Sequence, residues 1–337
     1  MSEAVVVVPN WNGRAELAAC LDSLQKQSLK PRVIVVDNGS SDGSVELIEK
    51  DYPRVELIKH SQNKGYAGGV NPGFKRAIEL KAKYVAAFNN DAVADGDWLK
   101  NLVEYLDGHD EAGIATCKLL TEDGKRLDST GDYYTVWGLP YPRGRGETDL
   151  DKYDDQTDVF GASGGASLYR VKLLEQIGLL DEDFFAYYED VDLSFRAQLA
   201  GWKVAYVPAA VAYHKIGATS GQLKGFTTYQ TMKNLQLLWY KNVPRRYRFK
   251  TGWRFTLASC LFLLRAVTRR QGWAALKGDL KGSYLILKKR GERRRIQSSQ
   301  TVSDEYIWNL FVHDLPPNAR ALRRLRAAWW RPRRKKA

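Results

Sequence analysis

The chain has 337 residues, of which 44% are hydrophobic and 27% charged, an ordinary composition for a folded globular protein. Its net charge of +13 is unevenly distributed: residues 1–240 carry 26 Lys and Arg against 34 Asp and Glu, whereas residues 241–337 carry 26 against 5. Since the larger part of the chain is acidic, this distribution does not support a nucleic-acid-binding protein and describes an acidic body with a basic C-terminal region.

The cysteines and the apolar runs indicate the redox compartment and whether the chain carries a signal peptide or a transmembrane segment. Cys20, Cys117 and Cys260 share no disulfide or metal spacing, and their odd number fits a reducing compartment. The apolar run Val5–Val8 has no basic flank and stops at a proline, so we expect no signal peptide. The longest apolar run, Phe255–Leu264, has ten residues where a spanning helix needs about 20, so we expect no transmembrane segment.

Short apolar segments alternate with helical patterns through the first third of the chain. The segments are Ala4–Val8, Arg32–Val36, Val55–Lys59 and Tyr84–Phe88, and the helical patterns lie around Leu17–Leu24, Ser44–Lys50, Pro72–Lys81 and Asp95–Asp107. This alternation predicts an α/β fold with a parallel sheet and right-handed crossovers. Asn71 followed by Pro72 resembles an N-cap with proline at the first helical position, so we expect the third helix to begin there.

The predicted strands end in polar turns, and the carboxyl ends of parallel strands are where ligands bind in such sheets. The candidate residues of the four turns are Pro9, Asn10 and Asn12; Asp37; Asn63, Gly65 and Gly68; and Asn90 and Asp91. Asp37 alone would fit an ordinary turn, but beside three similar turns it favours a nucleotide site. The chain lacks the G-x-G-x-x-G and P-loop motifs. Phosphate oxygens and water commonly complete the coordination shell of Mg²⁺. Asp91 and few other protein ligands are therefore enough to hold Mg²⁺ at a diphosphate site.

Two further segments have open interpretations. Thr121–Asp158 is polar, glycine-rich and aromatic, which fits equally a cover over the sheet edge where an acceptor lies and a simple surface insertion. An aromatic run then ends in three acids that open a helix, Glu189, Asp190 and Asp192. Acids in a first turn commonly stabilise the helix end, but one of them could be a general base. The residues alone do not decide which acid it is.

Taken together, these segments resemble the inverting glycosyltransferases of family 2, which have the nucleotide-sugar-binding GT-A fold with a mostly parallel, Rossmann-like sheet. The matching segments follow one another in the family's order over about residues 3–225. They are Val5–Asn12, Val35–Gly43, Asn63–Asn71, Phe88–Asp91, Phe160–Arg170, Phe184–Arg196 and His214–Gly221. A narrower resemblance, carried by Phe160–Tyr169 and Tyr187–Arg196, is to bacterial rhamnosyltransferases, which transfer L-rhamnose from dTDP-rhamnose to a polyprenyl-diphosphate-linked sugar in cell-envelope polysaccharide synthesis.

The resemblance implies roles for individual residues. It assigns to the nucleotide sugar Pro9, Asn10, Asn12, Asp37, Asn63, Gly65, Gly68 and Asn90. It assigns Asp91 and His214 to a divalent cation, Mg²⁺ or Mn²⁺, although a lone histidine after a strand is more often a packing residue. Asp190 would be the catalytic base. The sequence departs from a full D-x-D motif at Asn89, whose neutral amide is a poor metal ligand, so Asn89 receives no metal role.

The basic region is expected to be helical from residue 226 to residue 337, after a catalytic domain at residues 1–225. Three groups of apolar side chains recur there at helical spacing among Lys and Arg: Trp253, Leu257, Leu261 and Leu264; Trp273, Leu276, Leu280 and Leu287; and Leu322, Leu325 and Trp329. Basic amphipathic helices with Trp predict peripheral attachment to an anionic membrane, here the cytoplasmic face of the cell membrane. The alternative is that these stripes pack on the catalytic domain or in a dimer.

Other functions remain open at this level. A family 2 enzyme could instead use a UDP-hexose or UDP-galactofuranose donor on another glycan. A sugar nucleotidyltransferase would share the sheet and the metal, but it is expected to have a glycine-rich, basic first turn where this chain has Asn10-Trp11-Asn12-Gly13. A non-catalytic scaffold is disfavoured by the presence of Asp91, Asp190 and His214. The oligomeric state is not indicated.

Overall fold

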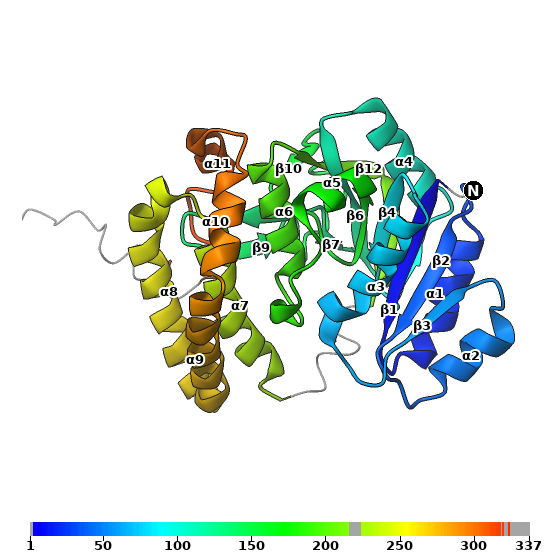
Figure 1. Cartoon of the computed structure of the whole chain (residues 1–337), viewed down its shortest axis with the longest axis horizontal. Coiled ribbons are helices and arrows are strands. Elements are labelled where there is room, and N and C mark those ends of the chain that lie inside the picture. Colours follow the sequence, from blue (N-terminus) through cyan, green and yellow to red (C-terminus); the bar gives the residue numbers. More distant parts are fainter. Residues whose placement is uncertain (1–2, 216–223, 318, 320–322, 324–337) are drawn as a thin grey trace, which may run out of the picture.

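A twisted mixed sheet with helices on both faces forms one half of the molecule, and a group of helices from the C-terminal part of the chain lies beside it (Figure 1). The computed structural model describes residues 3–215, 224–317, 319 and 323. Within these residues the main sheet has the strand order β10-β12-β6-β11-β4-β1-β2-β3, while β5 pairs with β12 and β7 with β6. The strands are β1 (Ala4–Asn10), β2 (Arg32–Asp37), β3 (Glu56–Lys59), β4 (Tyr84–Phe88), β5 (Ala92–Ala94), β6 (Ala112–Thr121), β7 (Leu127–Ser129), β10 (Asp158–Val159), β11 (Ala166–Arg170) and β12 (Lys203–His214).

The first four strands of the chain, β1 to β4, pair in parallel, as the alternating pattern predicts. The pairs β1/β2, β1/β4 and β2/β3 are parallel, as is β6/β12, whereas β11 runs antiparallel between β4 and β6. The helices that cover the sheet are α1 (Arg14–Gln25), α2 (Ser44–Asp51), α3 (Gly65–Glu79), α4 (Trp98–Gly108), α5 (Val171–Ile177) and α6 (Glu189–Leu199). The expected α/β class is therefore confirmed.

Strand β1 illustrates why the sheet forms at the centre. All of its residues are buried, the pattern of a parallel strand covered on both faces. Val6 and Val8 join the core beneath α1, α2 and α4, whereas Val5 and Val7 join the core beneath α3, α5 and α6. Because side chains alternate between faces along a strand, one run of valines supplies both cores.

The expected start of the third helix is wrong. Helix α3 begins at Gly65, so Asn71 and Pro72 lie inside it. Pro72 has no N–H to donate to the carbonyl of Gly68, and the ring of His60 approaches that carbonyl oxygen instead, with Nε2 at 3.3 Å. The side chain of Asn71 caps no helix; it donates to the carbonyl of Leu180 at 2.9 Å and accepts from its N–H at 3.1 Å.

Thr121–Asp158 is more regular than the sequence suggested. Strand β7 continues the main sheet by pairing with β6, and β8 (Asp132–Tyr134) pairs with β9 (Pro140–Pro142) as a separate two-stranded sheet. The guanidinium of Arg143 is buried within the segment and donates to the carbonyl oxygens of Thr130 and Gln156 at 2.9 and 2.8 Å. This segment is thus a structured layer over one end of the sheet.

The C-terminal part of the described chain is helical, as expected. Its helices are α7 (Phe226–Asn242), α8 (Arg248–Thr268), α9 (Gly272–Lys288), α10 (Arg290–Ser298) and α11 (Asp304–Leu310). An aromatic core that includes Tyr134, Phe160, Phe195 and Phe311 joins α11 to the sheet half. No helix in the described ranges combines the length and hydropathy needed to cross a bilayer. The third apolar group, Leu322, Leu325 and Trp329, lies outside the described residues, as do residues 216–221 of the motif that begins at His214.

Candidate active site

A cavity of about 670 Å³ opens beyond the carboxyl ends of the central strands, where the polar turns were expected to converge. Eight of the residues assigned from the sequence line it: Pro9, Asn10, Asn63, Gly65, Asn90, Asp91, Asp190 and His214. Three others, Asn12, Asp37 and Gly68, lie close by but do not line the cavity. Its volume is within the range of small-molecule sites, which is about 300–1,000 Å³.

A chain of amide and carboxylate groups organises the floor of the cavity. Asn90 donates to Asn10 Oδ1 at 2.8 Å, and Asn10 donates to Asp37 Oδ1 at 3.1 Å. The other carboxylate oxygen of Asp37 accepts the backbone N–H groups of Gly39 and Ser40 at 3.1 and 2.9 Å. Asp37 is therefore buried as the organiser of its own turn, and the nucleotide contact assigned to it stays a prediction.

Asp91 and His214 are 123 residues apart in the sequence and meet in the cavity. Asp91 follows β4, and His214 is the last residue of β12. His214 Nε2 lies 3.1 Å from Asp91 Oδ1, and His214 Nδ1 lies 2.8 Å from Asp128 Oδ2. The imidazole is thus oriented from behind by a carboxylate that is 1% exposed, an arrangement common behind metal-binding histidines.

This pair fits a divalent cation. Although burial alone would lower it, hydrogen bonds to Asp128 and Asp91 raise the pKa of His214 to about 9. The same two carboxylates would favour a divalent cation held by Asp91 and His214, which would replace the ring proton. No cluster of three or more metal-ligating side chains occurs among the described residues, so protein ligands would supply only part of the coordination shell. Phosphate oxygens and water commonly supply the rest for Mg²⁺.

Three charged residues of the cavity lining were missed by reasoning from the sequence: Asp128, Asp132 and Arg145, all from the Thr121–Asp158 segment. Arg145 forms an ion pair with Asp128 at 2.8 Å, and Asp132 lies near Asp190. Nothing local separated Asp128 and Asp132 from the many other acids of the segment, or Arg145 from its other cations. The pairing of β7 with β6 brings Asp128 to His214, and only that non-local contact identifies it.

Asp190 is held at the cavity wall by the backbone. Its Oδ2 accepts the N–H of Gly164 and its Oδ1 accepts the N–H of Val191, both at 2.8 Å. A Cβ at position 164 would lie 3.1 Å from Asp190 Oδ2, so glycine permits this approach. Burial raises the pKa of Asp190 despite these two bonds. Burial and the charge of Asp190 also raise the pKa of Asp132 and of Glu189 well above their usual range.

The loop that leads into α6 has an unusual backbone. Phe185, Tyr187 and Tyr188 have φ angles of 64°, 73° and 69°, in the left-handed region that non-glycine residues rarely adopt. Asn234 of α7 donates its side-chain amide to the carbonyls of Phe184, Ala186 and Tyr187 at 2.8 to 2.9 Å. Helix α7 lies beyond the expected domain boundary at residue 225, yet it holds the loop that precedes Asp190.

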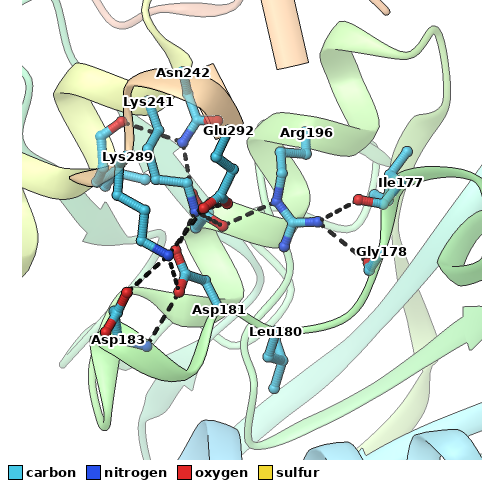
Figure 2. Close-up of polar contacts among 12 residues, drawn as sticks. Ile177, Gly178, Leu180, Asp181, Asp183, Arg196, Lys241, Asn242, Lys289 and Glu292 are labelled. Atoms are coloured by element: carbon cyan, nitrogen blue, oxygen red, sulfur yellow. Dashed lines mark hydrogen bonds and ion pairs between the residues drawn. The ribbon is translucent and has the colours of Figure 1, made fainter. Parts of the chain in front are cut away.

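The opposite side of the first turn of α6 carries a buried ion-pair network (Figure 2). Asp192 Oδ2 pairs with Arg196 at 2.9 Å and with Lys241 at 3.1 Å, and its Oδ1 accepts from Asn242 at 2.8 Å. The ammonium group of Lys241, which is fully buried, also pairs with Asp181 at 2.6 Å and with Glu292 at 2.8 Å. This network fastens α6 to α7 and to α10.

Lys289 extends the same network to the surface and pairs with Asp181 at 2.7 Å, Asp183 at 2.9 Å and Glu292 at 2.9 Å. Burial alone would raise the pKa of Asp181 and of Asp192, but Lys241 lowers both, together with Lys289 at Asp181 and Arg196 at Asp192. Their charges are therefore balanced within the protein.

Comparison with known proteins is consistent with this geometry. The family model described as glycosyl transferase family 2 matches residues 5–178. The chain is 29% identical over 235 residues to the N-acetylglucosaminyl-diphospho-decaprenol L-rhamnosyltransferase of Mycobacterium tuberculosis, an alignment that covers 64% of this chain and 76% of that protein. It is 23% identical to the dTDP-rhamnosyl transferase RfbF of Shigella flexneri, over 72% of this chain and 81% of that one.

Among solved structures, the mannosyltransferase PcManGT of Pyrobaculum calidifontis, in complex with GDP-Man and Mn²⁺, is similar in fold. It superposes with a TM-score of 0.54 at 16% identity, over 91% of this chain and 85% of that one. At this identity the likeness concerns the fold alone. The expected GT-A arrangement of sheet and covering helices is therefore confirmed.

Proposed function

Because this chain belongs to glycosyltransferase family 2 and is a glycosyltransferase, we propose that it transfers L-rhamnose from dTDP-L-rhamnose to a sugar carried on polyprenyl diphosphate. The names of the two relatives support this donor and this class of acceptor. The observation that carries the proposal is that one cavity contains both Asp91 hydrogen-bonded to His214, a pair that fits a cation, and an acid with a raised pKa, Asp190.

Asp190 acts as the base in this proposal. The acceptor hydroxyl oxygen attacks the anomeric carbon of the donor as the bond from that carbon to the diphosphate oxygen breaks, and the hydroxyl proton passes to the Asp190 carboxylate. A single displacement of this kind inverts the anomeric configuration. The N–H groups of Gly164 and Val191 orient the carboxylate, and burial raises its pKa, which makes it a stronger base than an exposed aspartate.

Asp91 and His214 would hold a divalent cation, Mg²⁺ or Mn²⁺, which when bound offsets negative charge on the diphosphate leaving group. Asp128 keeps the His214 ring in place through Nδ1. The solved neighbour with GDP-Man and Mn²⁺ supports this cofactor class for the fold. Pro9, Asn10, Asn63, Gly65 and Asn90 would contact the nucleotide sugar from the other side of the cavity, with Asn12, Asp37 and Gly68 supporting their turns.

The test is a transfer assay with the full chain. We expect dTDP release and a glycosylated product when dTDP-L-rhamnose, Mn²⁺ and a short-chain polyprenyl-diphosphate N-acetylglucosamine are supplied together, and neither when EDTA replaces the metal. UDP-hexoses and UDP-galactofuranose serve as parallel donors. Product from one of these, with none from dTDP-rhamnose, would overturn the proposed donor while leaving the enzyme class intact.

A second measurement isolates the metal. Asp128→Asn keeps the shape of the side chain but removes the charge behind His214, and the loss of such a partner typically weakens metal affinity about 10–100-fold. Calorimetric titration of Mn²⁺ in the presence of dTDP reads this directly, without turnover. Unchanged Mn²⁺ affinity in both Asp128→Asn and His214→Ala would show that the cation does not bind at this pair.

A further inference from the structure

Exposed large hydrophobic side chains are concentrated on two helices, α8 and α9. Within the parts of the chain that the structure describes, Val93 is the one such residue found elsewhere. The others are Phe249, Trp253, Leu257, Leu264, Val267, Trp273, Leu276, Leu280, Tyr284 and Leu287. We refer to these ten as the α8–α9 surface. Apolar groups gathered in this way on an otherwise polar protein mark a surface that binds something.

These side chains are not the inward faces of the helices. They recur at steps of three or four residues along α9 and of three, four or seven residues along α8, which places them in one stripe per helix. The inward faces are already occupied: Phe255 and Ala258 of α8 are buried, and a Cβ at Gly278 of α9 would lie 2.3 Å from the carbonyl oxygen of Tyr229 in α7. Each helix therefore has a packed side and, separately, an exposed apolar stripe.

Positive charge surrounds the two stripes. Residues 248–288 contain nine Lys and Arg and a single acid, Asp279, which accepts a hydrogen bond from Gln236 at 2.8 Å. Several of the cations lie against the aromatic members of the surface, including Arg254 over Trp253 at 4.7 Å and Lys277 over Trp273 at 5.2 Å. Apolar stripes flanked by Lys and Arg, with Trp among them, are typical of helices that lie in the headgroup region of a bilayer.

The turn between α8 and α9 lies beside residues that line the cavity. Thr228 of α7 donates a hydrogen bond to Gln271 in the turn between α8 and α9, and a Cβ at Gly225 would lie 3.2 Å from that of Ala274. Phe226 and Thr227, which adjoin these contacts, line the cavity. An acceptor whose lipid chain is held by a membrane under α8 and α9 would have its sugar close to the cavity.

We propose that α8 and α9 lie flat on an anionic lipid bilayer through this surface, which presents the cavity to an acceptor anchored in the same bilayer. The inference rests on the proposed function for its acceptor, but the attachment itself can be measured without turnover. The bilayer takes up the apolar side chains, and its anionic headgroups neutralise the nine cations.

A second copy of the chain is the competing occupant, and charge argues against it. A two-fold interface brings the same patch from both copies together. Here it would bring cations from both copies together, with Asp279 as the single acid on each side to offset them. An anionic bilayer can bury the apolar side chains and neutralise the cations, whereas a second copy of the chain can only bury the apolar side chains.

The test is flotation of the full chain with vesicles of phosphatidylcholine alone or with phosphatidylglycerol. Lys277→Gln/Lys281→Gln/Lys288→Gln removes three exposed charges from α9. At roughly 1 kcal/mol for each cation near an anionic surface, this triple variant should bind phosphatidylglycerol vesicles on the order of 100-fold more weakly. The matched control, Lys26→Gln/Lys50→Gln/Lys75→Gln, removes equally exposed charges from the sheet half and should bind as the unaltered chain does.

Replacement of exposed leucines by serine tests whether the apolar side chains contribute to membrane binding. Leu264→Ser/Leu280→Ser should lose flotation while keeping the circular dichroism melting curve, since both side chains are exposed. Flotation of this variant or of the α9 triple variant equal to that of the unaltered chain would overturn the proposal. So would light scattering that shows the unaltered chain as a dimer and Leu264→Ser/Leu280→Ser as a monomer, because the surface would then be a contact between copies.

Transfer to a short-chain, water-soluble acceptor separates this inference from the proposed function. We expect both variants to retain that activity and to lose activity toward a full-length acceptor in phosphatidylglycerol vesicles. Loss of flotation together with loss of the soluble reaction would contradict a purely membrane-binding role for the surface. Failure of the unaltered chain to use any soluble acceptor would refute the proposed function and leave the flotation result standing.

Discussion

The two sides of the first turn of α6 differ in whether their buried carboxylates are paired with cations. On the cavity side, Asp190 lies near two other acids, Asp132 and Glu189, and all three have raised pKa values. On the far side, only two residues further along, Asp192 lies among Lys241, Arg196 and Asn242, and its pKa is lowered. Neighbouring acids of one helical turn therefore have opposite electrostatic surroundings.

The two surroundings correspond to two roles: the paired acid helps to hold α6 in place, and the unpaired acid is available for chemistry in the cavity. A buried acid paired with cations is held in its charged form and fastens the elements that supply its partners. A buried acid without a cation partner tends to take up a proton, and so can accept one from a substrate. The ion pairs of Asp192 fix α6 in position. Asp190, on the other side of the helix, is thereby held at the cavity wall.

The largest effect should come from the cavity side. Asp190→Asn removes the base, which typically costs about 10²–10⁴-fold in rate, while relieving repulsion with Asp132 and Glu189. We expect transfer to fall by that factor, with dTDP binding unchanged. Turnover close to that of the unaltered enzyme would rule out Asp190 as the base.

The far side should respond in the opposite way, in stability. Lys241→Met leaves Asp181 and Asp192 buried without their shared cation, and breaking a buried pair typically costs about 3–5 kcal/mol in the free energy of unfolding. Urea unfolding measures this loss. Lys75→Met, on the exposed side of α3, is the control and should change little. Equal stability of the two variants would show that the network is not needed to hold α6.

The pH dependence of that difference follows from the direction of the pKa shifts. Lys241 lowers the pKa of Asp181 and of Asp192, so the stability it contributes is present above their unfolded pKa, near 3.8, and is lost as the pH falls through the folded values. The unfolding free energies of the unaltered chain and Lys241→Met should therefore differ fully at neutral pH and converge below about pH 4.

A smaller effect is expected where α7 meets the strained loop. Asn234→Leu keeps the size of the side chain but leaves the carbonyls of Phe184, Ala186 and Tyr187 without their donor, a change worth about 1–3 kcal/mol. Because the loop leads into Asp190, we expect kcat to fall while KM for the donor changes little. Asn101→Leu, which removes an amide-to-carbonyl bond on α4, controls for the loss of a hydrogen bond alone. A fall in stability without a change in kcat would assign Asn234 a purely structural role.

The smallest expected effect is at Asp132. Burial, then the charge of Asp190, raises its pKa, so its neutral form favours folding at low pH and that contribution is lost as the pH rises through the folded pKa. Asp132→Asn should therefore raise the melting temperature at pH 8 by a few degrees and have no such effect near pH 4. A destabilised variant at pH 8 would show that Asp132 is charged and favourably paired.

Reasoning from the sequence reached the fold and most of the cavity lining, but it failed at particular points. The start of α3 was misplaced because Asn71-Pro72 has the local chemistry of a helix start, while the residues before it are glycine-rich and look like a loop. Asp128 was missed because its importance comes from pairing of β7 with β6, which no local pattern reports. On the residues alone, Glu189, Asp190 and Asp192 were equivalent as first-turn acids, and only the family resemblance singled out Asp190.

What the sequence determined by itself was the alternation of apolar strands with amphipathic helices, the polar residues at the strand ends and the basic apolar stripes of the C-terminal part. These features depend on side-chain spacing along the chain, which is a local property. Tertiary structure alone decided that Asp91 meets His214, that Asp192 is paired while Asp190 faces the cavity, and which apolar stripes stay exposed. The reason is physical: the charge state and exposure of a side chain depend on groups that only folding brings within a few ångströms of it.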